Sequence, residues 1–393
     1  MKHLVKHIFI GTLLLVFVAC EVLEQDPISS LSSGNFFETA EHARSALTST
    51  YAAFRNTLNG GQGNVRYSAW GDLRADLLTT DAGKNGSYDR LDDNEQNPTD
   101  PVADWSNLYQ TIARANDVIA NVPGIEDIDL TAENKSEILA EARFLRALSY
   151  FYLVRLWGDV PLSMEPVNSA SDPVDLPRVS REVVLDTIEA DISYALSRLP
   201  EAYSSNSDTR GRATLGAAYA LQAHVYAWQA NWEAAAASAQ QVIQNPLYEL
   251  LPSDRYADIF DAENTVESIF ELQIDPFNAG EGTSALFIDF GTDEQNGGVT
   301  GELGVFLPSQ KFLDNLEEGD LRRSVLVFDG EGRFRPQIVK YILPFSRTDL
   351  GTSVDNRTSE ADNNIIIYRL ADIILLRAES LNYLDRTEEA TAL

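Results

Sequence analysis

The segment from Thr131 to Trp157 constrains the fold of this chain more than any other. Its apolar residues recur at helical spacing, and they lie on nearly all sides of the predicted helix. One row consists of Ile138, Ala142, Leu145, Ser149, Tyr152 and Leu156, and other sides carry Leu139, Phe144, Leu148, Phe151 and Val154. A helix that is apolar nearly all round is buried between neighbours. We therefore predict other helices packed around this one, which ends at Gly158 and Pro161.

Other segments show the same helical periodicity or helix-capping signals. They are residues 40–58, 108–122, 181–199, 213–229, 232–244 and 365–384, and a short helix that begins at Thr387. Residues 213–244 place two helices and a tight turn, with Asn231 as N-cap, within about 34 residues, the tetratricopeptide period. Because a single helix pair cannot bury its own apolar face, several pairs must stack. We predict a helix-dominated, tetratricopeptide-like solenoid of about four pairs.

The stretch between the third and fourth pairs has a different pattern. Residues 268–274 alternate as a strand does, and residues 324–328 and 338–342 are further strand candidates, with glycine-rich loops over residues 277–304. We predict a loop-rich insertion with a few short strands on one face of the solenoid. The chain ends at Leu393, soon after its last predicted helix begins, so we expect the C-terminal region to be incomplete.

The N-terminus is typical of a bacterial lipoprotein signal. A short basic head precedes an apolar run over residues 8–19, and Cys20, the only cysteine of the chain, follows directly. The run is shorter than the roughly 20 residues that span a bilayer. We expect residues 1–19 to be a signal peptide, Cys20 to be lipidated, and residues 20–34 to form a tether. Phe17 departs from the usual lipobox, and the alternative is a plain signal peptide followed by an incidental cysteine.

Charge excludes several classes of function. Removing residues 1–19 takes away two lysines and no carboxylate, so the net charge goes from −30 to −32. Nucleic acids and anionic lipid headgroups are therefore not expected partners, since they require clustered Lys and Arg. The chain has no His-Glu-x-x-His pattern, no Gly-x-Ser-x-Gly elbow and no phosphate loop, and only four histidines. We expect no enzymatic activity, no metal centre and no cofactor.

A Gly-rich and Asp-rich excursion over residues 59–104 shows no clear period, and we predict that it is a loop carrying a ligand site. Its candidate ligand-binding residues are Tyr67, Trp70, Asp72, Arg74, Asp76 and Tyr88. Sugars stack apolar C–H faces on aromatic rings, while their hydroxyl groups bond to carboxylates and guanidinium groups. The alternative is that Trp70 and Leu73 attach the loop to the solenoid, with Arg74 paired to Asp76 or Asp72.

Two weaker candidates have simpler alternatives. Phe277, Phe287, Asp289 and Phe290 of the insertion could touch a ligand, although phenylalanines of this kind are more typical of a local core. The acidic residues Asp89, Asp92, Asp93 and Glu95 could hold calcium. They lack the spacing of an EF-hand, which favours a solvated acidic loop. Helical positions predict packing roles for Trp105, Trp157, Trp228 and Trp232.

Several blocks of the chain resemble the SusD/RagB family of outer-membrane lipoproteins. Glu141 to Leu162 contains Arg-x-x-Arg-Ala-x-x-Tyr-Phe followed by Trp-Gly-Asp-Val-Pro, the pattern most diagnostic of that family. Cys20-Glu-Val-Leu-Glu-Gln-Asp-Pro27 and Asn35-Phe-Phe37 are similar to its opening elements. Gly211-Arg-Ala-Thr214 with Ala223-His-Val-Tyr226, and Tyr368 to Glu379, resemble its later repeats. The blocks occur in family order along the whole chain.

The resemblance implies a fold of four tetratricopeptide-like pairs, with residues 35–245 as the N-terminal region and residues 246–393 as an incomplete C-terminal region. It implies a surface-exposed binding lipoprotein of the outer membrane, without catalysis, that captures glycan and delivers it to a SusC-type TonB-dependent transporter. The alternative is oligopeptide capture, as in the RagB branch, or a scaffold that binds only proteins. Arg143, Arg146 and Asp159 belong to the diagnostic block, and their place on a buried helix predicts structural ion pairs.

Overall fold

The computed structural model describes residues 36–60, 64–83, 85–166, 175–275, 283–290, 304–328, 336–341 and 362–393. The signal peptide, Cys20, the tether and Phe277 lie outside these ranges, and the side chain of Phe287 is not described. The longer helices are α3 (Ala40–Asn59), α6 (Ser106–Asn121), α7 (Ala132–Trp157), α8 (Arg181–Leu196), α10 (Leu215–Trp228), α11 (Trp232–Ile243) and α16 (Leu370–Tyr383).

Short helical segments lie between these long helices and at the end of the chain. In chain order they are α4 (Arg66–Ser68), the π-helical turn η1 (Ala69–Leu73), α5 (Gly86–Asp92), η2 (Pro101–Ala103), η3 (Val122–Gly124), α9 (Asn206–Gly211), η4 (Ser253–Arg255), α12 (Asp258–Asp261), α13 (Ala285–Phe290), α14 (Gln310–Asn315), α15 (Arg323–Leu326) and α17 (Thr387–Thr391). None of the described helices is long and apolar enough to cross a membrane.

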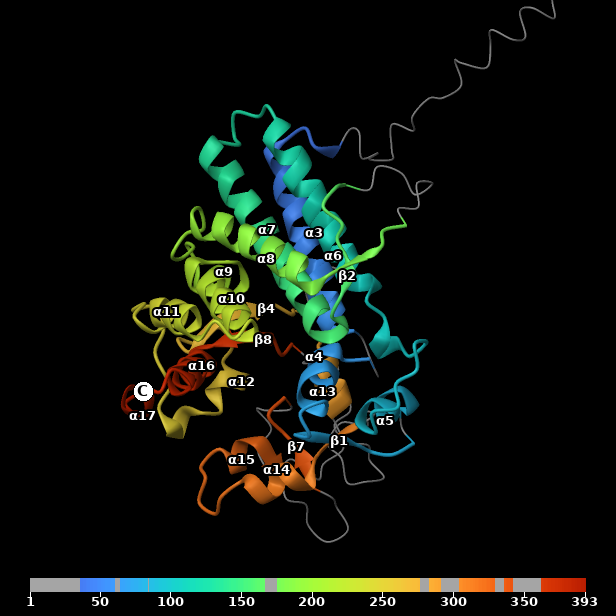
Figure 1. Ribbon diagram of the computed structural model, residues 1–393, viewed down its shortest axis with the longest axis vertical. Coiled ribbons are helices and arrows are strands. Elements are labelled where there is room, and N and C mark those ends of the chain that lie inside the picture. Colours follow the sequence, from blue (N-terminus) through green and yellow to red (C-terminus); the bar gives the residue numbers. More distant parts are fainter. Residues whose placement is uncertain are drawn as a thin grey trace, which may run out of the picture.

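Within the described residues the seven long helices and the short α17 pack in chain order as four stacked pairs, which confirms the predicted solenoid. The pairs are α3 with α6, α7 with α8, α10 with α11, and α16 with α17 (Figure 1). Contacts between α6 and α7, between α8 and α10, and between α11 and α16 join each pair to the next. The middle of α7 is buried nearly all round, as predicted: between Ala140 and Val154 only Arg143 and Tyr152 are not fully buried.

Side-chain caps set the helix starts close to where the pattern predicted them. Thr131, Thr214 and Asn231 each accept a hydrogen bond from the backbone N–H three residues ahead, at the starts of α7, α10 and α11. At the other end of α3, Gly60 adopts φ 63°, and a Cβ there would lie 1.8 Å from the carbonyl oxygen of Asn64. Only glycine permits this turn into the excursion.

Strands are few and short within the described residues, and they form four two-stranded antiparallel sheets. The pairs are β1 (Leu78–Thr80) with β5 (Phe306–Pro308), β2 (Val160–Pro161) with β3 (Arg178–Val179), β4 (Ser268–Leu272) with β8 (Ile365–Arg369), and β6 (Val327–Phe328) with β7 (Gln337–Ile338). The β4–β8 pair lies beside α10 and α16, at the base of the insertion (Figure 1).

Three predictions for strands need correction. Residues 338–342 were expected to form a strand, and among the described ones only Ile338 does so, as part of β7. Residues 365–369 were expected to begin the last long helix, but they form β8, because the β-branched run Ile365–Ile367 pairs with the buried strand β4. Residues 324–328 were expected to form a strand, and only Val327–Phe328 does so, after the helical turn α15. The strand predicted at residues 268–274 is confirmed as β4.

A carboxyl beside the β4–β8 pair makes stability depend on pH. Glu263 Oε1 accepts a hydrogen bond from the backbone N–H of Asn364 at 2.6 Å. Burial, with a smaller contribution from the neighbouring carboxylates of Glu271, Asp362 and Asp261, raises the pKa of Glu263 from 4.5 to about 8. Between about pH 4.5 and 8, Glu263 is therefore protonated in the folded chain and ionised in the unfolded chain. This group lowers the free energy of unfolding as pH rises from about 4.5 to 8, by up to about 1.4 kcal/mol per pH unit.

We expect Glu263→Gln, which stays neutral, to be increasingly more stable than the unmodified chain as pH rises through this window. Urea denaturation followed by circular dichroism between pH 5 and 8.5 measures the difference. Parallel stability curves for the two proteins would show that Glu263 titrates alike in the folded and unfolded states.

Candidate functional site

The described residues of the excursion over residues 59–104 form several short regular elements and are not an irregular loop. It contains α4, η1, β1, α5 and η2, which are too short to produce a readable period. Arg66 lies buried beneath it and donates hydrogen bonds to the carbonyl oxygens of Thr57 and Pro101, at 3.3 and 3.2 Å. The buried Arg66 guanidinium therefore joins the excursion to the carbonyl oxygen of Thr57 in α3.

Trp70 fastens the excursion to the solenoid. Its indole N–H donates to the carbonyl oxygen of Val102 at 2.8 Å, and its ring lies 5.6 Å from that of Trp157 in an edge-to-face arrangement. Leu73, one turn further, is buried in the same core. These contacts support the alternative in which Trp70 and Leu73 attach the loop to α7.

The prediction that Tyr88 contacts a ligand is wrong. Its side chain is 0% exposed, its hydroxyl donates to Asp289 Oδ2 at 3.0 Å, and its ring packs 4.7 Å from that of Phe306. Burial, reinforced by the Asp289 carboxylate, raises the pKa of Tyr88, so the phenol stays protonated. Asp289 and Phe290 are buried with it, which confirms a core role for Phe290.

Arg74 and Asp76 are exposed but do not pair as predicted. Arg74 donates to Asn94 Oδ1 at 2.8 Å, while Asp76 accepts from Lys311 Nζ at 2.9 Å. The structure separates them because the chain turns at Asp76, whose φ is 58°. The predicted pairing of Arg74 with Asp72 or Asp76 is therefore wrong.

The acidic stretch after β1 bonds mainly to its own loop. Asp89 accepts from the backbone N–H of Gly83 at 2.9 Å, and Asp92 accepts from Thr79 Oγ1 at 2.8 Å. Asp93 and Glu95 point into solvent. Among the described residues no three His, Cys, Asp or Glu side chains gather in the way that a metal ion requires.

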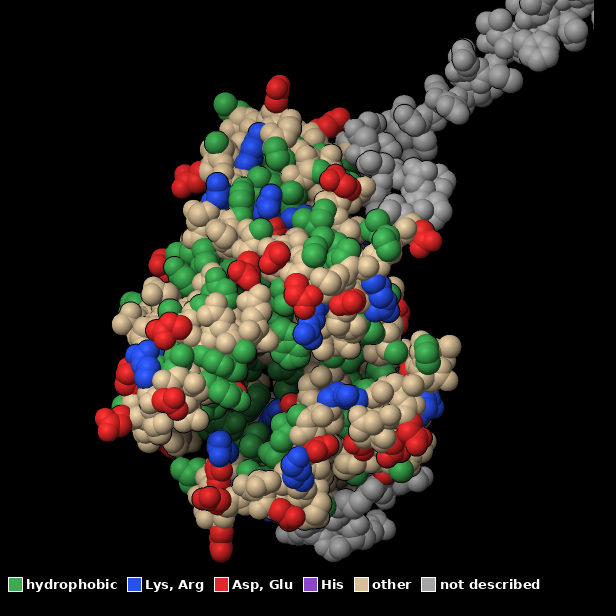
Figure 2. All heavy atoms as spheres, in the orientation of Figure 1, with side chains coloured by type: hydrophobic (Ala, Val, Ile, Leu, Met, Phe, Trp, Pro, Cys, Tyr) green, Lys and Arg blue, Asp and Glu red, His purple; other side chains and the backbone are tan. Residues whose placement is uncertain are grey.

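Tyr67 and Asp72 meet aromatic and basic residues of the insertion. Figure 2 shows the visible face hollowed between α12 and α16 on one side and α4 on the other, with apolar side chains in its walls. The segments that border this hollow carry a connected group of side chains, which we call the aromatic cleft: Tyr67, Asp72, Tyr256, Phe260, Lys340, Tyr341 and Arg369.

Basic groups lie over the aromatic rings of this cleft. The Lys340 ammonium is 3.9 Å from Asp72 and lies 4.7 and 5.7 Å from the ring centres of Tyr341 and Phe260. The Arg369 guanidinium lies 6.0 Å from the ring of Tyr256, which contacts Phe260 at 5.8 Å. Cation–π contact and the carboxylate hold these side chains in place, and all of them except the buried Tyr341 stay partly exposed.

The two phenols at the base of the cleft stay protonated. Tyr67 donates to the carbonyl oxygen of Ile366 at 2.7 Å, which ties the excursion to β8. Burial raises the pKa of Tyr67 and of Tyr341. The cleft thus offers ring surfaces, ammonium and guanidinium donors and one carboxylate acceptor. This set can stack and hydrogen-bond a polar ligand.

Sequence reasoning found only Tyr67 and Asp72 of this group. The other five lie at least 180 positions further along the chain, and no periodicity connects an excursion to an insertion. Lys340 and Tyr341 were assigned to a strand candidate on alternation alone. An aromatic residue directly beside a lysine in a region without clear periodicity was the one signal available.

Comparisons with known proteins agree with the solenoid and with the diagnostic block. A SusD-like family model, described as starch-binding associating with the outer membrane, matches residues 41–227. A SusD-like protein of Formosa agariphila is 26% identical and aligns over 93% of this chain and 75% of its own length. The chain belongs to the SusD-like family.

Two solved SusD-like structures show the same fold. A laminarin-binding SusD-like protein superposes with a TM-score of 0.72 at 24% identity, over 88% of this chain and 81% of its own. Surface glycan-binding protein A of Bacteroides thetaiotaomicron, solved with laminarihexaose, gives a TM-score of 0.68 at 20% identity, over 88% and 79%.

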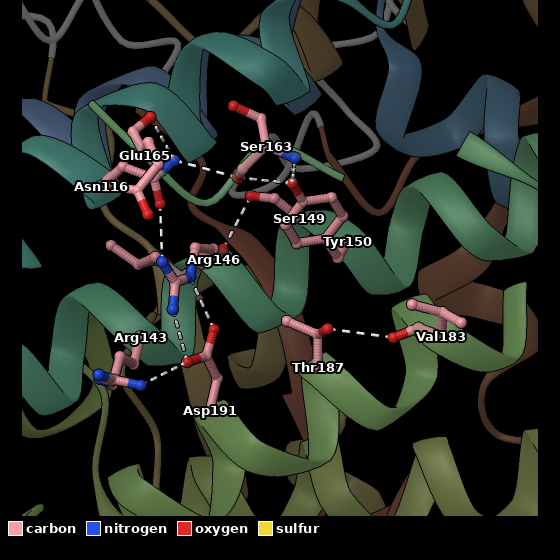
Figure 3. A network of polar contacts seen from close by, with 11 residues as sticks. Asn116, Arg143, Arg146, Ser149, Tyr150, Ser163, Glu165, Val183, Thr187 and Asp191 are labelled. Atoms are coloured by element: carbon pink, nitrogen blue, oxygen red, sulfur yellow. Dashed lines mark hydrogen bonds and ion pairs between the residues drawn. The ribbon is translucent and has the colours of Figure 1, made fainter. Parts of the chain in front are cut away.

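The diagnostic block of this SusD-like chain builds a buried ion pair. Arg146 of α7 donates Nε and Nη2 to the two carboxylate oxygens of Asp191 in α8, at 2.7 and 2.8 Å (Figure 3). Its Nη1 donates to Asn116 Oδ1 of α6 at 2.7 Å, and Arg143 adds a bond to Asp191 at 2.9 Å. The prediction of structural ion pairs is confirmed for both arginines. Asp159 instead accepts from the backbone N–H of Arg181.

The third SusD-like repeat block forms a second buried junction. Arg212 donates Nη2 to Glu141 Oε1 at 2.5 Å, and the Tyr51 hydroxyl donates to Glu141 Oε2 at 2.6 Å. Burial raises the pKa of Glu141, and the bond from Arg212 opposes that rise. Gly211 lies against Gln273, whose Cγ would be 2.7 Å from an added Cβ. These residues join α3, α7 and α9 to the strand β4.

Proposed function

We propose that this protein is a lipid-anchored, surface-exposed nutrient-binding protein of the outer membrane. It captures polysaccharide or oligosaccharide and delivers it to a SusC-type TonB-dependent transporter. The observation that carries the proposal is the aromatic cleft, where half-exposed rings of Tyr256 and Phe260 lie beside Lys340, Arg369 and Asp72. The glycan ligands named for two SusD-like structures of the same fold support this choice of ligand class.

The cleft would recognise a sugar by stacking and by charge-assisted hydrogen bonds. A pyranose ring has apolar C–H faces that fit an aromatic ring, and its hydroxyl groups both donate and accept. Lys340 and Arg369 supply donors for sugar oxygens, and Asp72 supplies an acceptor for a hydroxyl hydrogen. Contacts to cations and rings already hold these groups, so binding costs little side-chain ordering.

The same residues favour binding over hydrolysis. Glycoside hydrolysis in most families needs two carboxyl groups on either side of the bond to be broken. Asp72 is the only carboxylate among the seven residues of the cleft, and its nearest cation is Lys340. We therefore propose a binding protein whose ligand leaves chemically unchanged.

Affinity electrophoresis of the form that lacks residues 1–20 tests the proposal. The panel contains laminarin, other plant, fungal and host polysaccharides, and a peptide pool. We expect one polysaccharide to retard the protein, and Phe260→Ala or Lys340→Met to weaken that binding about tenfold, since each loses about 1–2 kcal/mol of stacking or charge-assisted contact. Trp228→Ala is the matched control, because Trp228 is 49% exposed at the end of α10 and is not one of the cleft residues.

The panel also separates the alternatives. Retention of peptides alone would replace glycan capture by oligopeptide capture. Binding of neither class would contradict nutrient binding and favour a protein-interaction scaffold. Delivery is tested separately: the full-length lipoprotein, solubilised from its native membrane, should co-purify with a TonB-dependent transporter.

A further inference from the structure

A second hollow lies on the other part of the excursion, away from the aromatic cleft. It encloses about 800 Å³, and its walls are residues 96–101 and 103–105 together with Trp157 and Arg178. None of the seven cleft residues lines it. Its size is within the range of about 300–1,000 Å³ that is typical of small-ligand sites.

Two indole rings form the apolar part of this hollow. Trp105 and Trp157 are both half-buried, with ring centres 5.8 Å apart and ring planes at 58°. Neighbouring rings hold each of them: Trp70 contacts Trp157 edge-on, and Tyr109 contacts Trp105 at 5.8 Å. The indoles therefore keep their positions without a ligand, and little ordering is required when one binds.

Polar groups of both signs surround the indoles. The Arg178 guanidinium lies 4.6 Å from the ring of Trp105 and donates Nη1 to the carbonyl oxygen of Asp159. Asp104 is exposed, and its two carboxylate oxygens accept from the backbone N–H and hydroxyl of Ser106, each keeping lone pairs for another donor. Asn97 adds an exposed side-chain amide.

We propose that this hollow, the tryptophan site, binds one or two sugar units of a glycan by stacking on Trp105 or Trp157. The inference rests on the proposed function and adds a second subsite to it. A hollow with fixed indoles and separate donors and acceptors fits a neutral, many-hydroxyl ligand. The Asp104 carboxylate would repel a simple anion, and the Arg178 guanidinium would repel a simple cation.

The position of the tryptophan site explains why a long glycan would use it. Trp70 contacts Trp157 of this site and also Tyr152, at 5.6 and 6.3 Å. Tyr67, three residues before Trp70, belongs to the aromatic cleft, so both sites are built on one short segment. A polymer that occupies both gains avidity, because the second contact becomes intramolecular.

Calorimetry with an oligosaccharide and its parent polymer tests the tryptophan site. Laminarihexaose and laminarin are the first pair, followed by the equivalent pair for any other polysaccharide that the panel retains. We expect two hexasaccharide sites on the unmodified protein, one on Trp105→Ala and one on Phe260→Ala. We also expect at least tenfold weaker polymer binding by Trp105→Ala. Arg178→Ala, at an exposed side chain, should weaken the second site without disturbing the core, and Trp228→Ala serves as control.

The outcomes separate the two proposals. A single hexasaccharide site, with polymer affinity unchanged in both Trp105→Ala and Arg178→Ala, overturns the tryptophan site and leaves the aromatic cleft intact. Glycan binding that survives Phe260→Ala and disappears in Trp105→Ala supports the tryptophan site and contradicts the cleft. An unmodified protein that binds no glycan overturns the proposed function and this inference with it.

Discussion

Replacing Arg146 with alanine should lower the free energy of unfolding by about 3–5 kcal/mol. Its side chain and that of Asp191 are 3% and 2% exposed, and two direct bonds join them. The substitution leaves the Asp191 carboxylate buried with only the partly exposed Arg143 as a cation, and it leaves Asn116 Oδ1 without its donor. The loss is large against the total of about 5–15 kcal/mol that is common for folded domains. Urea denaturation measures it.

Arg143→Ala is the matched control, since it removes a bond to the same carboxylate from a side chain that is 29% exposed. We expect it to cost no more than about 1 kcal/mol. The double variant Arg146→Ala with Asp191→Ala should recover part of the loss, because no buried charge then lacks a partner. A loss below about 1 kcal/mol for Arg146→Ala would show that water reaches the junction of α6, α7 and α8.

Replacing Cys20 with serine should move the protein from the membrane fraction to the soluble fraction. The chain has no other cysteine, so serine at this position removes every thiol that could carry an acyl chain. Two or more acyl chains anchor a protein stably, whereas the described body has no membrane-spanning helix to replace them. Phase partitioning in detergent and labelling with radioactive fatty acid measure the change.

The matched control is Ser29→Ala, which alters the tether without touching the thiol. A Cys20→Ser variant that stays in the membrane fraction after high-salt washing would contradict lipid anchoring. Protease treatment of intact cells then tests surface exposure, which predicts that the unmodified protein is digested while a periplasmic control protein survives.

Local patterns were sufficient to predict the solenoid. Several long helices combine helical spacing with a capping residue or a terminating glycine, as at Asn231 for α11 and Gly158 for α7. Helix α16 has neither and was predicted from its spacing alone. The error at residues 365–369 has a local cause, since a run of isoleucines fits a buried strand as well as a buried helix. Residues 365–369 form a strand because they pair with β4, which lies about a hundred residues earlier in the chain.

The candidate site was less predictable because it joins distant segments. Tyr67 and Asp72 were identified, but Phe260 and Lys340 reach them only after the insertion has folded against the excursion. Tyr88 shows the opposite error: its aromatic ring in a glycine-rich stretch is typical of an exposed contact, yet Asp289 gives its hydroxyl a buried partner two hundred residues away. Single-sequence patterns carry no information on such pairings.

The pairing of β4 with β8 brings the two ends of a long inserted segment together. Residues 273–364 leave the frame at Leu272 and return to it at Ile365, where the two strands lie side by side. Lengthening a tethered segment costs little, about 0.6 kcal/mol for each doubling. Exchange of this inserted segment would therefore replace Lys340 and Tyr341 of the aromatic cleft while the stacked helices stayed intact. The proposed ligand preference would then change through one inserted segment, without any change in the helix pairs.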